Sequence, residues 1–85
     1  MPRRPKKIPL TIALGRAIRE LRKERGLSQE ALGFDAELDR TYISLVELGR
    51  KSPTINTIER LATSLRTKTS DLILRAETIV KRSRA

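Results

Sequence analysis

The chain has 85 residues, enough for a single domain, and a formal net charge of +9 at pH 7. It contains no cysteine and no histidine, which excludes disulfides, thiolate or imidazole metal sites and the usual acid–base catalysts. No apolar run approaches the roughly 20 residues of a membrane span, and the basic N-terminus lacks the apolar part of a signal peptide. We therefore expect a soluble cytoplasmic protein with no cofactor, no metal and no membrane partner.

The positive charge is concentrated at the two ends of the chain. Residues 1–9 contain three prolines and four basic residues and predict a flexible basic arm. Residues 81–85 contain three more basic residues and predict a basic C-terminal tail, whereas the segment between carries 12 basic and 10 acidic residues. Because the excess lies in the tails, charge alone does not establish nucleic-acid binding, and the folded part must supply the reason.

The first predicted helix begins near Leu10. Its apolar residues recur with helical period along one face, and its charged residues fill the opposite face. Gly26 ends this helix, because the left-handed position that follows a helix favours glycine. The apolar stripe consists of Leu14, Ala17, Ile18 and Leu21.

Two short helices follow in quick succession. Ser28 suits the N-cap of the second helix, which runs to about Ala36. Asp39 is the next capping residue, and Gly49 ends the third helix. Since only residues 37 and 38 separate the two helices, the segment predicts a tight helix–turn–helix.

Two further helices complete the predicted fold. Thr54 caps the fourth helix, residues 67–70 form a break, and a fifth helix follows. No segment alternates with period two, so the predicted fold class is all-α with five helices. We assign four apolar residues of the fourth helix to the core: Ile55, Ile58, Leu61 and Leu65.

The third helix has an outer face with an unusual composition. Ile43 and Val46 point inward at helical spacing, so the opposite face is free for a ligand. The major groove of DNA accepts a helix that presents a forked donor for guanine, small hydroxyls and an apolar group for the thymine methyl. These side chains would be Arg40, Thr41 or Ser44, and Leu45. The spacing of these residues alone is equally consistent with the ordinary solvent-exposed face of a small helix.

Three longer motifs carry a specific resemblance. GLSQEALG at 26–33, LDRTYISLVELG at 38–49 and SPTINTIERLA at 52–62 resemble the phage-repressor and Cro type of helix-turn-helix, the XRE family. The resemblance covers about residues 12–74. It implies a five-helix, lambda-repressor-like DNA-binding domain, here residues 10–80, in which the second and third helices form the helix-turn-helix and which dimerises on an operator.

The resemblance also implies roles for individual residues. The positions that contact bases in the family are occupied by Arg40, Thr41, Ser44 and Leu45. The positions that contact phosphates are occupied by Gln29, Tyr42, Arg50 and Lys51, and Ser28 can share the phosphate at the start of the second helix. Arg22 and Glu47 match a mostly buried ion pair that ties the first helix to the end of the third. The chain departs from the family pattern at Gly33, Glu37, Arg66 and Thr67.

The fifth helix carries more apolar residues than one face of a lone helix can bury. We expect a second copy of the domain to cover the rest, which gives a homodimer with recognition helices about 34 Å apart on a palindrome. The predicted dimerisation residues are Leu72, Ile73, Leu74, Ile79 and Val80.

The function that we expect is sequence-specific binding of double-stranded DNA by a homodimeric transcription regulator, a repressor of its operator in the bacterial or phage nucleoid. An antitoxin that masks a toxin, or a controller of a restriction–modification system, remains an alternative with the same domain, and a toxin or RNA polymerase would be the protein partner. An RNA-binding protein is less well supported, because two aromatic residues give no stacking platform. We do not expect an enzyme, since the chain has neither catalytic histidine or cysteine nor a glycine-rich phosphate loop.

Overall fold

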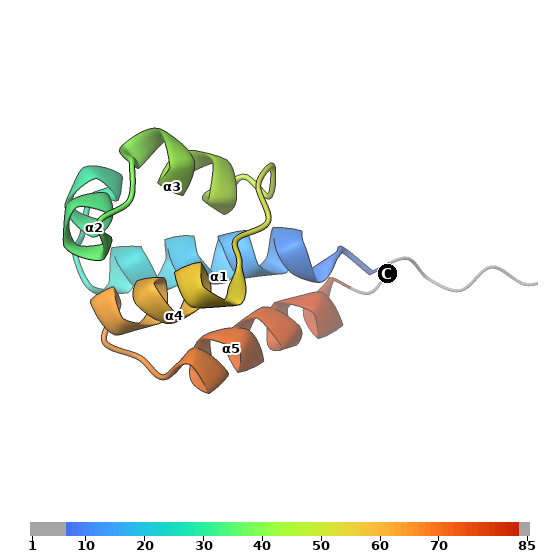
Figure 1. Cartoon of the computed structure of the whole chain (residues 1–85). Helices are drawn as coiled ribbons and strands as arrows, with labels where there is room; N and C mark the ends of the chain where they lie inside the picture. The colour runs from blue at the N-terminus through green and yellow to red at the C-terminus, as the bar shows by residue number, and fades with distance from the viewer. Residues whose placement is uncertain (1–6, 84–85) are drawn as a thin grey trace, which may run out of the picture.

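The computed structural model describes residues 7–83, which contain five α-helices and no strand. α1 lies in the middle of the bundle, with α2 and α3 over one side of it and α5 along the other (Figure 1). The predicted all-α class with five helices is therefore confirmed. The helices are α1 (Leu10–Glu24), α2 (Gln29–Ala36), α3 (Arg40–Glu47), α4 (Ile55–Ser64) and α5 (Thr69–Arg82).

The three predicted N-caps begin α2, α3 and α4. The Ser28 hydroxyl accepts a hydrogen bond from the Ala31 N–H at 2.9 Å. The carboxylate of Asp39 accepts from the Thr41 N–H at 2.7 Å. The Thr54 hydroxyl accepts a hydrogen bond from the Thr57 N–H at 3.2 Å. Each bond satisfies a backbone donor that the first helical turn leaves free, which fixes where the helix begins.

Glycines occupy the left-handed positions after α1 and α3. Gly26 has φ of 69° and Gly49 has φ of 74°, where a side chain would be strained. Gly49 also lies against α1, because an added Cβ would come within 2.8 Å of the Ile12 side chain. The loop after α3 is therefore held close to the beginning of α1.

One apolar core joins the five helices. It contains the inward face of α1 and the buried residues of the four other helices, and Ile8 and Val80 pack against its edge. Its largest fully buried side chains are Ile18, Leu32, Ile43, Leu61, Leu65, Leu72 and Val46. Within the part of the chain that the structure describes, no helix combines the length and apolar character that crossing a membrane requires.

A surface ion pair joins α1 to α5 on the outside of this core. Arg75 Nη1 lies 2.6 Å from Glu24 Oε2 and 3.4 Å from Glu20 Oε1. The hydrogen bonds from Arg75 lower the pKa of the Glu24 carboxyl and raise the pKa of Arg75 itself. Because both partners reach solvent, this pair contributes little to the free energy of folding.

One prediction about the core was wrong, and two segments differ in detail from the expected bounds. Ile55 is 67% exposed, because it is the first residue of α4 and lies beyond the edge of the core. Ile8 is half-buried against the core and donates its N–H to Ser83 Oγ at 3.1 Å, so the predicted arm is fixed at its end. α5 continues through Lys81 and Arg82, past the predicted boundary at residue 80. The other tail residues named by sequence, residues 1–6 and 84–85, lie outside the described residues.

Candidate nucleic-acid interface

The third helix is fixed to the fold by its inner face. Ile43 and Val46 are fully buried in the core, as their spacing predicted. At Gly15 of α1 the two helix backbones meet, since an added Cβ would overlap the Val46 carbonyl oxygen and lie 2.8 Å from that of Glu47. The close approach of α1 and α3 therefore requires glycine at this position.

A buried ion pair holds the end of α3. Arg22 Nε lies 2.7 Å from Glu47 Oε2, and Arg22 Nη2 donates to Glu47 Oε1 at 3.0 Å. The third nitrogen of the guanidinium, Arg22 Nη1, donates to the Leu27 carbonyl at 2.8 Å, which joins the loop after α1 to the ion pair. This is the pair that the resemblance implied. Its two parallel hydrogen bonds compensate both buried charges.

Gln29 links the two helices of the helix-turn-helix. Its side-chain amide donates to Glu47 Oε1 at 3.1 Å, so the beginning of α2 is tied to the end of α3. Ser28 stands beside it and keeps its hydroxyl hydrogen, since the bond with Ala31 uses only the oxygen as acceptor. The brace that the resemblance assigned to Gln29 is present in the structure, and its phosphate contact stays a prediction.

The outer face of α3 is open to a ligand. Arg40 and Thr41 are exposed, and Ser44 and Leu45 are half-buried, so Leu45 is less open to water than its sequence position suggested. The three ion pairs among residues 7–83 involve Arg22 and Arg75 as the cations, which leaves the Arg40 guanidinium outside any of them. A forked donor and a hydroxyl thus lie exposed at the beginning of α3, and a second hydroxyl and an apolar group lie half-buried one turn later.

The predicted phosphate contacts surround this helix. Tyr42 is half-buried and packs against the core, and its contact with a phosphate stays a prediction. Arg50 and Lys51 are exposed in the loop that Gly49 starts. α2 lies at one end of α3 and the loop after α3 lies at the other end (Figure 1).

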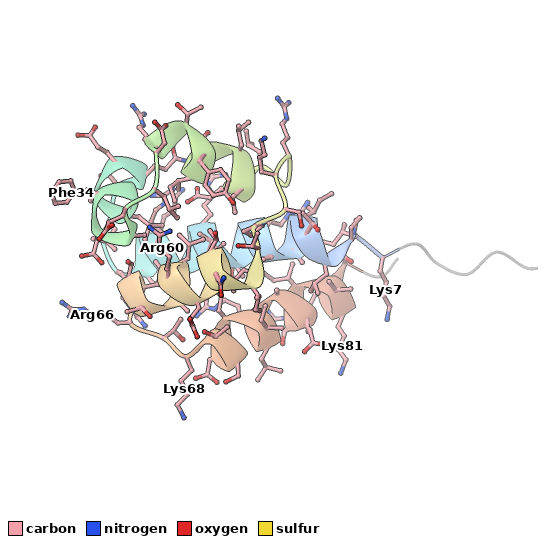
Figure 2. The ribbon with its side chains drawn as sticks, viewed as in Figure 1. Lys7, Phe34, Arg60, Arg66, Lys68 and Lys81 are labelled. Carbon is pink, nitrogen blue, oxygen red and sulfur yellow. The ribbon has the colours of Figure 1, made fainter. Side chains whose placement is uncertain are left out.

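The turn between α2 and α3 has a brace that the sequence did not reveal. Glu37 adopts φ of 57° without being glycine, and the Arg60 Nη2 donates to the carbonyls of Ala36 at 2.7 Å and Glu37 at 3.0 Å. Gly33 fits the same turn, because an added Cβ would lie 2.6 Å from the Leu38 carbonyl. Arg60 lies on α4 and extends towards the α2–α3 side of the molecule (Figure 2), and no spacing pattern in the sequence marks it as structural.

A second brace of the same kind follows α4. Arg66 also has φ of 57°, and Arg25 Nε donates to the neighbouring Leu65 carbonyl at 2.9 Å. In both places an arginine distant in sequence, Arg60 of α4 or Arg25 directly after α1, binds a carbonyl at or beside a non-glycine residue in the left-handed region. The two departures from the family pattern at residues 37 and 66 are therefore accommodated with outside support.

The predicted dimerisation residues separate into two groups. Leu72 has no exposed surface and belongs to the monomer core, because it faces inward from the first turn of α5; its assignment to a dimer interface was wrong. Ile73, Ile79 and Val80 are half-buried at the edge of the core, and Leu74 is 59% exposed. The exposed part of α5 lines a groove of about 340 Å³ that Leu74 and Ile79 share with Arg75.

Known proteins resemble this chain in sequence and in fold. The family model described as Helix-turn-helix matches residues 18–72. The immunity repressor protein of Bacillus phage phi105 is 35% identical over 74 residues, which are 87% of this chain and 51% of that protein. The chain thus spans about half the length of that relative. Control protein C.BamHI of Bacillus amyloliquefaciens is 32% identical over 65 residues, which are 75% of this chain and 80% of that protein.

A solved structure of a complex has the same fold. The restriction-modification controller protein C.Esp1396I, determined as a tetramer in complex with its natural 35 base-pair operator, has a TM-score of 0.80 and 27% sequence identity. The match covers 88% of this chain and 99% of that one. Given the match over residues 18–72 and the arrangement of α2 and α3, the chain belongs to the helix-turn-helix family of the phage-repressor (XRE) type.

Proposed function

We propose that this protein is a sequence-specific, double-stranded DNA-binding transcription regulator that acts as a homodimer on a palindromic operator. One observation carries the proposal: the outer face of α3 presents Arg40 and Thr41 to solvent while the inner face and the Arg22–Glu47 pair fix the helix. A helix that is held this firmly, with its polar side free, is suited to enter a groove of DNA as a rigid body.

The chemistry of that face fits base edges in the major groove. This groove is about 12 Å wide and admits one helix. Arg40, at the start of α3, can donate two parallel hydrogen bonds to guanine, and the hydroxyls of Thr41 and Ser44 can bind other edges. Leu45 offers an apolar contact for a thymine methyl.

The surrounding donors fit the phosphate backbone. The N-terminus of α2 directs free N–H groups and a positive dipole end outward, beside Ser28 and Gln29. Arg50, Lys51 and the Tyr42 hydroxyl would bind phosphates on the other side of α3. These contacts carry affinity and register, whereas the α3 face carries sequence preference.

A two-fold dimer would place two such helices on one side of DNA. The exposed apolar surface on α5, around Leu74 with Ile73, Ile79 and Val80 beside it, is the contact that we assign to the dimer. Recognition helices about 34 Å apart then meet successive turns of the major groove. The operator-bound tetramer of C.Esp1396I supports the proposal that this chain also binds DNA as an oligomer.

Two classes of regulator fit these observations. The resemblance to the phi105 immunity repressor supports a repressor. The alternative is a restriction–modification controller, which is favoured by the match to C.BamHI over 80% of that protein's length. Both classes use the same interface, so one experiment on DNA binding tests either.

Selection of bound sites from random duplex DNA tests the proposal. We expect an enriched palindrome whose half-sites lie about 10–10.5 base pairs apart, centre to centre. Log affinity for that site should fall steeply with log salt concentration. A bound pool without a common sequence, or equal affinity for every duplex, would contradict the proposal.

A further inference from the structure

An exposed leucine lies at the end of α3, outside the core of the domain. Leu48 directly follows the last residue of α3 and is 58% exposed. It belongs neither to the buried core nor to the partly buried apolar side chains that pack against that core. Its apolar surface is therefore available to a ligand, and removal of that surface from water would contribute to binding.

Leu48 continues the outer face of α3 by one position. Its backbone is still helical, with φ of −82° and ψ of −3°, and its N–H donates to the Ser44 carbonyl at 3.0 Å. Helical spacing places position 48 on the same side of the helix as Leu45, three residues earlier. The opposite side of α3 is buried in the core. The apolar group that Leu45 presents is therefore followed, about one turn later, by a second and more exposed one.

Backbone hydrogen bonds fix the end of α3 around this side chain. The Gly49 N–H donates to the Val46 carbonyl at 3.0 Å. The Arg50 N–H donates to the Leu45 carbonyl at 2.9 Å, which completes a Schellman motif. Gly49 supplies the left-handed conformation that this motif requires, with φ of 74°. The direction in which Leu48 leaves the backbone is thus fixed before any ligand binds.

We propose that Leu48 is a specificity-determining residue that contacts the C5 methyl group of a thymine in the operator. The inference rests on the proposed function. Leu48 lies between the face assigned to bases and the loop assigned to phosphates, because Arg50 and Lys51 follow it by two and three residues. The methyl group of thymine is on the side of the base edge nearest the backbone of its own strand. It is also the apolar group of the major-groove edge, and a side chain without donors or acceptors suits it.

The spacing along α3 gives the place of this thymine in the operator. Leu48 follows Arg40 by eight residues, which corresponds to about 12 Å along the helix axis. Successive base pairs are about 3.4 Å apart, so the two side chains reach base pairs about three to four steps apart. We therefore expect each half-site to carry a guanine for Arg40 and a thymine about three to four base pairs away, with the contact of Leu45 between them.

Replacement of thymine by deoxyuridine removes only the methyl group and so tests the contact. Each thymine of the operator selected with the wild-type chain is replaced singly, and affinities are measured for wild type, Leu48→Ala and Ile55→Ala. We expect wild type to lose affinity by about threefold to tenfold at the assigned thymine, and Leu48→Ala to bind both duplexes equally there. Ile55→Ala shortens another exposed apolar side chain, on α4, and should keep the wild-type loss.

A second selection from random duplex DNA, carried out with Leu48→Ser, tests the same contact without modified bases. The serine hydroxyl can bind the edges of several bases, so thymine should no longer be enriched at the assigned position. The guanine assigned to Arg40 should remain enriched. Since the substituted side chain is exposed, Leu48→Ser and Leu48→Ala should unfold at nearly the urea concentration of wild type. Thymine that stays enriched with Leu48→Ser would contradict the assignment.

The remaining outcomes separate this inference from the proposed function. An equal loss on methyl removal in wild type and Leu48→Ala would overturn the role of Leu48 alone. The same conclusion would follow from a half-site without thymine at the expected distance, or from wild type that binds the deoxyuridine duplex as tightly as the parent operator. A wild-type pool without any common sequence would overturn both the proposed regulator and this inference.

Discussion

α3 and α5 are stabilised in different ways although both pack on α1. α3 has eight residues and ends in the buried ion pair of Arg22 and Glu47, with its backbone pressed against Gly15. α5 has 14 residues, packs through apolar side chains and carries only the exposed pair of Arg75 with Glu20 and Glu24. A helix of eight residues is marginal alone. Polar contacts and close backbone approach therefore stabilise α3, whereas length and buried apolar area stabilise α5.

The difference follows from what each helix must leave exposed. Half of the surface of α3 must remain polar and open if it is to read DNA, so its apolar anchors are limited to Ile43 and Val46. Directional contacts fix orientation as well as position, which apolar packing over so small an area would not achieve. Substitutions that remove one kind of contact at a time should therefore affect the two helices unequally.

Replacing Glu47 with alanine should separate the two kinds of ion pair most clearly. The change leaves the buried Arg22 charge uncompensated and should lower the free energy of unfolding by about 3–5 kcal/mol. Glu24→Ala removes the exposed partner of Arg75 and should have a far smaller effect. Urea denaturation followed by circular dichroism measures both, and Glu47→Gln provides a milder variant should the alanine variant not fold. Equal losses of unfolding free energy in Glu47→Ala and Glu24→Ala would contradict the difference between the buried and the exposed ion pair.

Filling the close approach of α1 and α3 should come next. Gly15→Ala places a methyl group against the Val46 and Glu47 carbonyls, which are backbone atoms of a helix and can move only with it. We expect a loss of about 1–3 kcal/mol and weaker DNA binding, because α3 is displaced. Arg16→Ala, on the exposed side of the same turn, is the control and should unfold at nearly the urea concentration of the parent. Unchanged stability of Gly15→Ala would mean that the two helices can separate freely.

Removing the arginine that braces the turn tests whether orientation depends on polar contacts outside α3. Arg60→Ala frees two carbonyls at the end of α2 and should cost about 1–2 kcal/mol. Affinity for the selected operator, measured well below the unfolding temperature, should also fall. Arg60→Lys keeps the charge but replaces the planar guanidinium whose Nη2 binds both carbonyls, so its affinity separates positioning from general attraction to DNA. Full affinity in the alanine variant would mean that Arg60 contributes to the stability of the fold and not to the orientation of α3.

Relieving the strained turn residue should have the smallest effect and the opposite sign. Glu37 is in the left-handed region, so Glu37→Gly should raise the free energy of unfolding by about 0.5–1 kcal/mol. Asp35→Gly, two residues earlier within α2, should lower it by about 1 kcal/mol, since glycine disfavours helix interiors. A destabilised Glu37→Gly variant would indicate that the Glu37 side chain itself supports the turn.

Local signals allowed the helix boundaries to be predicted from sequence. Ser28, Asp39 and Thr54 cap helices through amides two or three positions away, and Gly26 and Gly49 act through their own backbone angles. Such interactions depend on neighbours along the chain. For this reason the helix-turn-helix could be located from the order of residues alone.

Interactions between distant residues could not be predicted in this way. Arg60 reaches a carbonyl 24 positions away and Arg25 one 40 positions away, and nothing in the helical period indicates where a long side chain ends. The Arg22–Glu47 pair was found only through the family resemblance. The period also grouped Ile55 with the core and Leu72 with a dimer face, because it gives the side of a helix but not how far the core extends along it.

In the proposed complex the outer face of α3 reads bases, and the loop after α3 binds the phosphate backbone of DNA. The direct test measures the affinities of Arg40→Ala and Lys51→Ala for the selected operator and for each of its single-base variants. We predict that Arg40→Ala loses about 1–3 kcal/mol of preference at one base pair, and that Lys51→Ala weakens binding to every sequence alike. Uniform weakening by Arg40→Ala, with no base pair relaxed, would contradict the claim.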